Sequence, residues 1–142
     1  MPLPDSLADW LGRLVPNKPL GRRGERAAER HLRRSGYTIV ARGDRSKWGE
    51  LDLVAVDGKT IVFVEVKTRD GLDAGHPSEA VNLTKQRKLT RLAVSFLKRH
   101  GLLESPARFD VVAVTWPQDA RHPKIEHFKN AFDAVGQWES YS

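Results

Sequence analysis

The chain has 142 residues, of which 39% are hydrophobic and 30% are charged, a composition typical of one globular domain with its own core. No apolar run approaches the roughly 20 residues that a membrane-spanning helix needs. The first residues, MPLPDSLADWLGRLVP, lack the charged start and apolar stretch of a secretory signal, so no membrane association is expected. The absence of cysteine excludes disulfides and thiolate metal sites, and it fits a cytoplasmic location.

The formal charge of +6 is unevenly distributed along the chain. Residues 13–47 contain eleven Lys or Arg against three acidic residues, a net charge of +8, which leaves −2 for the rest. Most of these cations are arginines, whose planar guanidinium binds two phosphate oxygens at once. This segment predicts a polyanionic partner, with nucleic acid as the leading candidate and an ordinary solvated helix face as the plain alternative.

The N-terminal third contains an extension and the first helix. Residues 1–20 include four prolines, and we expect a mobile extension with one helical turn around residues 6–14. A single domain is expected over residues 21–138. Residues 21–35 predict a helix that Gly36 ends, with Glu25 on the same face as Ala28 and Leu32.

A β-rich region follows this helix. Residues 37–41 (YTIVA) predict a strand, and residues 42–48 (RGDRSKW) predict a polar loop. Two further strands are expected at residues 50–56 and 60–68, with Asp-Gly-Lys between them. Aspartate and glycine between two β-rich runs indicate a hairpin.

The second half of the chain completes an α/β pattern. After a loop at residues 70–77, Thr84 is predicted to cap a helix that ends near Arg99 and is basic in its first turns. A strand is expected at residues 108–115, a short edge strand at 124–128 and a final helix at 130–138. The order α-β-β-β-α-β with a β-α tail predicts a central mixed sheet flanked by helices.

Charged side chains interrupt the apolar pattern of the hairpin. Because side chains alternate along a strand, Asp52 shares a face with Val54, and Glu65 and Lys67 share a face with Phe63. The apolar neighbours argue against simple solvent exposure of this charged set. Whether Asp52 lies on the same face of the hairpin as Glu65 and Lys67 depends on the length of the turn.

Three turns are open for this hairpin. If Gly58 and Lys59 are central, the carboxylates of Asp52 and Glu65 lie directly opposite each other, with roughly 5 Å between Cβ atoms. If Asp57 and Gly58 are central, the two carboxylates are diagonal neighbours at roughly 7 Å. A three-residue loop with a bulge would place Asp52 and Glu65 on opposite faces of the hairpin.

Two carboxylates at such a distance repel each other, and a divalent cation between them resolves the conflict. Ligation by oxygen alone fits Mg²⁺ or Mn²⁺. Lys67 could stabilise charge that develops on a phosphate or orient a water, and Glu25 could supply a further carboxylate. The set suits metal-assisted hydrolysis of a phosphodiester; the plain alternatives are a solvated strand face and, for Glu25, a favourable position at a helix N-terminus.

Two other acidic residues have plain explanations. Glu50 is expected to be exposed where its strand begins or to form a salt bridge with Lys67, in preference to a ligand role. Asp110 lies near the start of a strand, where a structural role would account for it.

Four stretches resemble the PD-(D/E)XK nuclease superfamily, with its restriction-endonuclease-like fold, and more closely the YraN-like family of bacterial proteins. They are GRRGERAAERHLRRSGYTIVAR, GELDLVAVDGKTIVFVEVKTR, KQRKLTRLA and RFDVVAV. The resemblance implies Asp52 and Glu65 as metal ligands and Lys67 as the catalytic lysine. Glu25 matches an acidic residue on the first helix of the similar Holliday-junction resolvases. Leu51 stands where the name-giving pattern has proline, and many members of the superfamily also lack that proline.

The leading functional hypothesis is a Mg²⁺- or Mn²⁺-dependent nuclease that hydrolyses DNA phosphodiester bonds, with branched or junction DNA as one substrate class. A non-catalytic nucleic-acid-binding module of the same fold is the alternative, and a protein-interaction role is the third. A homodimer would suit a two-fold substrate such as a junction. The residues expected to bind nucleic acid are Arg22, Arg23, Arg26, Lys85 and Lys88.

Overall fold

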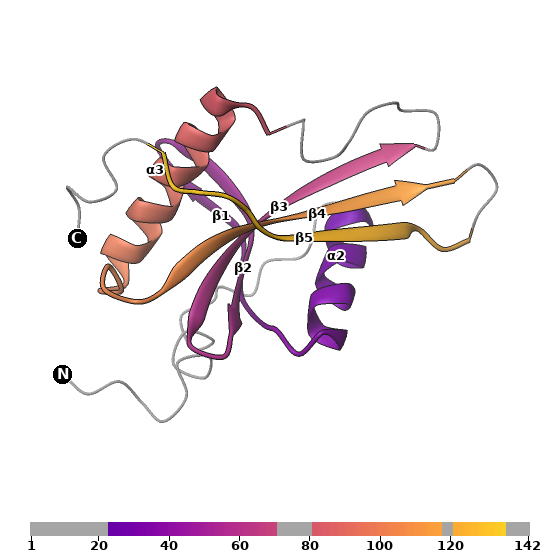
Figure 1. The fold of residues 1–142 in the computed structure, drawn as a ribbon, viewed down its shortest axis with the longest axis horizontal. Coiled ribbons are helices and arrows are strands. Elements are labelled where there is room, and N and C mark those ends of the chain that lie inside the picture. Colours follow the sequence, from indigo (N-terminus) through magenta and orange to yellow (C-terminus); the bar gives the residue numbers. More distant parts are fainter. Residues whose placement is uncertain (1–22, 71–80, 118–120, 136–142) are drawn as a thin grey trace.

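The computed structural model describes residues 23–70, 81–117 and 121–135 (Figure 1). In chain order the elements are α2 (Arg23–Arg34), β1 (Thr38–Ser46), β2 (Gly49–Asp57), β3 (Thr60–Asp70), α3 (Leu83–Arg99), β4 (Ala107–Trp116) and β5 (Lys124–Phe132). The expected extension at residues 1–20 and most of the expected loop at 70–77 lie outside the described residues. Among the described helices, none is long and apolar enough to cross a membrane.

The five strands form one mixed sheet in the order β1-β2-β3-β4-β5. β3 and β4 are parallel, and every other neighbouring pair is antiparallel. A parallel pair needs a crossover connection, and α3 provides it. Figure 1 shows α3 and α2 on opposite sides of the sheet. The predicted α/β architecture, a mixed sheet flanked by helices, is therefore confirmed.

Each helix covers its own apolar cluster. The α3 side of the sheet includes Val54, Val56, Ile61, Phe63 and Val111, packed with Leu89, Leu92 and Phe96 of the helix. The α2 side includes Leu53, Ala55, Val62, Val64 and Val112, packed with Ala28 and Leu32. Side chains of one strand thus alternate between the two cores, which fixes the register of β2 and β3.

The β2–β3 hairpin has the two-residue turn with Gly58 and Lys59 at its centre. Asp57 pairs with Thr60, and Gly58 has a φ of 62°, a conformation that glycine adopts without strain. This is the first of the three turns considered from the sequence. Continued along the strands, its register brings Asp52 across from Glu65.

The predicted loop at residues 42–48 is wrong, because β1 continues through Ser46 and the turn is confined to the next two residues. Ion pairs anchor its charged side chains. Arg42 binds Glu29 of α2 at 2.6 Å, and Arg45 binds Glu50 across the strand pair at 2.9 Å. A polar sequence can therefore form an edge strand when each charge has a partner.

Two further expectations are corrected at the ends of elements. The cap of α3 is Asn82, whose Oδ1 accepts a hydrogen bond from the Lys85 backbone at 2.9 Å, so Thr84 lies inside the helix. The predicted final helix is absent from the described part of its range, because β5 extends through Phe132. Phe132 pairs with Phe109 of β4 and stacks on its ring at 4.7 Å, which favours strand pairing there.

Candidate metal and nucleic-acid site

Asp52 lies where β2 separates from β3. The last backbone pair of the hairpin on this side is Leu53 with Val64. Beyond it, the N–H of Val66 donates to Oδ2 of Asp52 at 2.9 Å, so a carboxylate replaces the backbone carbonyl of a regular ladder. A carboxylate side chain reaches farther from its strand than a backbone carbonyl does, so this hydrogen bond spans a wider gap between the strands. Figure 1 shows β2 and β3 diverging toward this end. The separation of the strands makes room for side chains between them.

The environment of Asp52 disfavours its negative charge. Burial, together with the nearby carboxylates of Glu65 and Glu25, raises its pKa to about 7 from 3.8. The hydrogen bond from Val66 and the charge of Lys85 act in the opposite direction. Near neutral pH this carboxyl group therefore gains from either a proton or a cation.

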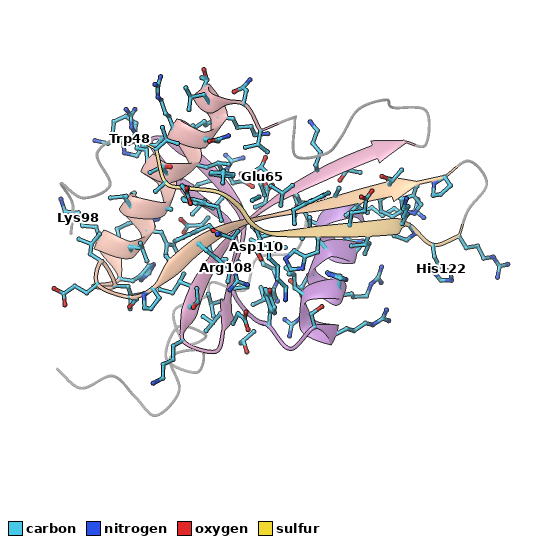
Figure 2. The ribbon with its side chains drawn as sticks, viewed as in Figure 1. Trp48, Glu65, Lys98, Arg108, Asp110 and His122 are labelled. Atoms are coloured by element: carbon cyan, nitrogen blue, oxygen red, sulfur yellow. The ribbon has the colours of Figure 1, made fainter. Side chains whose placement is uncertain are left out.

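Glu65 is held from the other side by α3. Its Oε1 lies 2.8 Å from Nζ of Lys85, and only 12% of the Glu65 side chain is exposed. Lys85 stands in the first turn of α3, where a cation is unfavourable to the helix dipole. The ion pair supplies a physical reason for a basic residue at this position. In Figure 2 Glu65 lies on the α3 side of the strands, away from Arg108 and Asp110.

The N-terminal turn of α2 brings Glu25 toward the same region. A Cβ atom on Gly24 would lie 2.0 Å from Oγ1 of Thr68, so only glycine allows α2 to approach β3 this closely. Glu25 is half-buried and acts electrostatically on Asp52. Lys67 is also half-buried, and by alternation it lies on the same face of β3 as Glu65.

The acidic residues converge without forming a ready three-ligand centre. Within the described residues, no group of three His, Asp or Glu side chains is arranged to hold a metal ion. The structure brings Asp52 and Glu65 together at the strand separation, with Glu25 in electrostatic range. Their roles as ligands, and that of Lys67 in catalysis, stay predictions.

A basic surface continues from this site along α3. Lys88 crosses the β1–β2 turn so closely that a Cβ atom on Gly49 would lie 2.8 Å from its Cε. The guanidinium of Arg91 lies 4.5 Å from the ring centre of Trp48, and Nζ of Lys47 lies 4.9 Å from it. Trp48 is 40% exposed, which is unusual for so large an apolar side chain.

Trp48 is not among the residues expected to bind nucleic acid, because residues 42–48 were expected to form a polar loop. A lone tryptophan among cations was the signal that could have found it. The two predicted cations on α2 lie elsewhere: Arg26 is exposed, and Arg23 lies 4.6 Å from the ring of Trp116. Arg22 lies outside the described residues.

The other acidic residues have structural partners. Glu50 is exposed where β2 begins, as one of its two sequence-based explanations expects, and it pairs with Arg45 rather than with Lys67. Asp110 is 0% exposed and accepts hydrogen bonds from Arg108 at 3.0 Å and from the Asn130 backbone at 3.0 Å. Its structural role agrees with the sequence-based interpretation.

Comparison with known proteins gives the family. Residues 24–114 match the model of the Uncharacterised protein family UPF0102. A UPF0102 protein of Rhodopirellula baltica is 47% identical over 129 residues, covering 89% of this chain and 77% of the relative. UPF0102 proteins of Geobacter sulfurreducens and Rhodococcus jostii are 50% and 48% identical and are covered over 91% and 100% of their lengths. The chain therefore belongs to family UPF0102, the YraN-like family that its motifs resemble.

Proposed function

We propose that this protein is a Mg²⁺- or Mn²⁺-dependent nuclease of the PD-(D/E)XK superfamily that hydrolyses DNA phosphodiester bonds. The observation that carries the proposal is the convergence of Asp52 and Glu65 where β2 and β3 separate. A sheet gains nothing from two facing carboxylates, one of which has a pKa raised to about 7. Perturbed acids at one site are typical of functional centres.

The donor set fits a hard divalent cation. Asp52 and Glu65 would hold it with oxygen ligands, and Mg²⁺ in proteins usually takes one or two carboxylates together with water and substrate phosphate. Glu25 would add negative charge from α2. The bound ion would offset the charge of these carboxylates and polarise a phosphodiester for attack by water.

The surrounding groups orient this chemistry. The N–H of Val66 holds one oxygen of Asp52, which restricts the direction of the carboxylate. Lys67 would place a positive charge beside the phosphate oxygens where negative charge develops. Lys85, which pairs with Glu65 at 2.8 Å, would move to a phosphate when Glu65 binds metal.

The basic surface of Lys85, Lys88, Arg91 and Trp48 supports nucleic acid as the partner. Cations would bind backbone phosphates, and the exposed ring of Trp48 would stack on a base at a strand end or branch.

A homodimer remains part of the proposal for a two-fold substrate. Light scattering of the purified protein at several concentrations tests it.

A cleavage assay tests the catalytic proposal. Linear, single-stranded and four-way-junction DNA are incubated with Mg²⁺, Mn²⁺ or EDTA. Metal-dependent cleavage is expected, with a loss of at least 100-fold in Asp52→Asn, Glu65→Gln and Lys67→Met, on the order of the loss when a charge-stabilising group is removed. Glu50→Gln is the matched control, because this exposed residue on the same hairpin pairs with Arg45. Cleavage that survives in Asp52→Asn and Glu65→Gln would refute the site.

The alternative is a non-catalytic nucleic-acid-binding module, which the arginine-rich first third of the sequence and the basic surface along α3 both favour. It predicts salt-sensitive binding without cleavage under any metal condition. Lys88→Gln with Arg91→Gln is expected to reduce the slope of log affinity against log salt by about 0.9 for each phosphate contact removed. Lys98→Gln, exposed in the last turn of α3, is the control. Unchanged affinity in the double variant would exclude this surface.

A further inference from the structure

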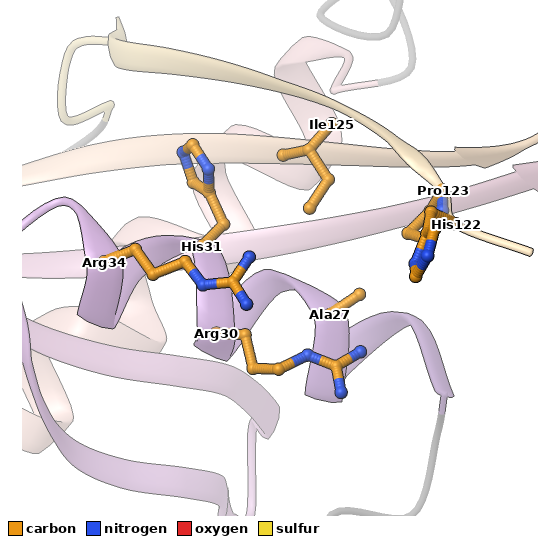
Figure 3. Close-up of a pocket in the computed structure, with 7 residues that line it drawn as sticks. All are labelled: Ala27, Arg30, His31, Arg34, His122, Pro123 and Ile125. Atoms are coloured by element: carbon orange, nitrogen blue, oxygen red, sulfur yellow. The ribbon is translucent and has the colours of Figure 1, made fainter.

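A cavity of about 330 Å³ lies on the opposite side of the sheet from Glu65, between α2 and the start of β5 (Figure 3). Its lining residues are Ala27, Arg30, His31, Arg34, His122, Pro123 and Ile125. Ala27 and Ile125 also belong to the apolar cluster beneath α2, so the cavity has an apolar wall. Its volume is at the lower end of the roughly 300–1,000 Å³ of small-molecule sites, enough for a phosphate with its sugar.

The polar lining of the cavity is entirely basic. Arg30 and Arg34 project from the same side of α2, one turn apart, and Figure 3 shows both beside His31. Like charges at this spacing destabilise an isolated helix. Within the described part of the chain, neither arginine has an acidic partner within ion-pair distance.

The acid nearest in sequence is engaged elsewhere. Glu29 binds Arg33 at 3.0 Å and Arg42 at 2.6 Å, so it does not neutralise the cavity. α2 therefore divides its charges between an ion-paired side and a side without acids. A bound anion would neutralise the positive charge of Arg30 and Arg34 on the side without acids.

The ring of His31 is held in position from inside the protein. Nε2 of His31 lies 3.3 Å from Nδ1 of His127, and Nε2 of His127 lies 2.8 Å from Oδ2 of Asp110. With Asp110 ionised and His127 neutral, His127 donates to Asp110 and accepts from His31, which places one hydrogen on each Nε2 atom. A cavity residue is thus connected to the buried acid through a chain of oriented rings.

We propose that this cavity is a second anion site that binds a phosphoryl group, with Arg30 and Arg34 donating hydrogen bonds to its oxygens and His31 beside them. Paired guanidinium groups match the geometry of phosphate oxygens. Ala27 and Ile125 would contact the attached sugar. The phosphoryl group comes either from a free nucleotide or from a nucleic-acid backbone, and this site is separate from the one proposed to hold metal.

Amide chemical-shift mapping tests the proposal on the intact ¹⁵N-labelled chain without metal. The probes are inorganic phosphate, adenosine monophosphate and a DNA oligonucleotide without terminal phosphates. Saturable shifts are expected at Ala27, His31 and Ile125. Shifts with the two small probes alone identify a free phosphate, shifts with the oligonucleotide identify a backbone phosphate, and either supports the site. Absence of shifts there with all three probes, or equal shifts over every basic surface, overturns it.

Matched variants of α2 sharpen the test. Arg30→Gln with Arg34→Gln is expected to weaken binding at least tenfold, whereas Arg33→Gln, which removes a charge from the same helix outside the cavity, leaves it unchanged. Equal weakening by both would overturn the proposal. If the double variant fails to fold, chemical-shift mapping on the unsubstituted chain still tests whether the cavity binds a phosphoryl group. Asp52→Asn is expected to retain this binding, so failure of the nuclease proposal and failure of this one are distinguishable.

Discussion

Nζ of Lys85 lies 2.8 Å from Oε1 of Glu65, so a cation from α3 already holds one oxygen of a proposed metal ligand. The Lys85 side chain is 36% exposed, whereas the Glu65 side chain is 12% exposed. The lysine can therefore swing into solvent while the carboxylate stays in place. A metal ion at the proposed site would compete with this ion pair for the negative charge of Glu65.

Replacing Lys85 by methionine is expected to increase affinity for Mg²⁺ or Mn²⁺ about two- to fivefold, because a partly exposed ion pair contributes roughly 0.5–1 kcal/mol. The same variant is expected to bind nucleic acid more weakly. Isothermal titration with Mn²⁺ measures the first effect, and Arg87→Met, on the exposed side of the same turn, is the control. Unchanged metal affinity in Lys85→Met would contradict the competition.

The raised pKa of Asp52 predicts a pH-dependent stability in the absence of metal. Burial, Glu65 and Glu25 raise this pKa to about 7, while Val66 and Lys85 oppose the shift. A group with a raised pKa stabilises the fold fully below its unfolded pKa of about 3.9, and this contribution is lost as pH rises through the folded value.

In EDTA, Asp52→Asn is therefore expected to melt at the same temperature as the parent at pH 4 and roughly 3–5 °C higher at pH 8, a shift that about 1 kcal/mol produces in a domain of this size. Thermal unfolding followed by circular dichroism measures the difference. Added Mg²⁺ should narrow it at pH 8 by stabilising only the parent. A variant less stable than the parent at pH 8 would show that burial does not strain this carboxylate.

The contact between α2 and β3 predicts a rescue experiment. Alanine usually stabilises a helix by about 1 kcal/mol relative to glycine, but at Gly24 its Cβ would overlap the Thr68 hydroxyl. Gly24→Ala is expected to lower the free energy of unfolding by roughly 1–3 kcal/mol and to reduce cleavage by displacing Glu25. Adding Thr68→Ala to this variant should restore much of the stability and much of the cleavage, because it removes the hydroxyl that the new Cβ would overlap. Urea unfolding and the cleavage assay check this, and a single variant as stable as the parent would refute the close contact.

The buried acid of β4 predicts the largest loss of stability. Burial alone would raise the pKa of Asp110, but hydrogen bonds from His127, Arg108 and the Asn130 backbone lower it. The stabilisation is present above the unfolded pKa, about 3.9, and is lost as pH falls below it. Asp110→Asn is expected to cost roughly 3 kcal/mol at pH 7 by urea unfolding.

Asp57→Asn provides the comparison for this network. Asp57 also binds Arg108, at 3.1 Å, but its side chain is 41% exposed. Its replacement is expected to cost less than about 1 kcal/mol. Equal losses in the two variants would mean that burial does not decide the strength of these contacts.

The hairpin was predictable because three local signals agree: alternation in β2, alternation in β3, and an aspartate-glycine turn between them. Either two-residue turn places Asp52 and Glu65 on one face, whereas the choice among the three turns required the observed pairing of Asp57 with Thr60. The extent of β1 and β5 was not predictable, because each depends on partners distant in sequence, such as Glu29 for Arg42 and Phe109 for Phe132. The cavity beside His31 escaped the sequence for the same reason, since β5 supplies its far wall.

The parallel pairing of β3 with β4 has a consequence for the order of assembly. The hairpin joins residues that are close in sequence, whereas β4 reaches β3 only after the chain has passed through α3. Local contacts form before distant ones, because closing a longer loop costs more entropy. A nascent chain would therefore carry the bare acidic pair first and gain the lysine of α3 later. Until that helix docks, Glu65 would lack the lysine that holds one of its oxygens.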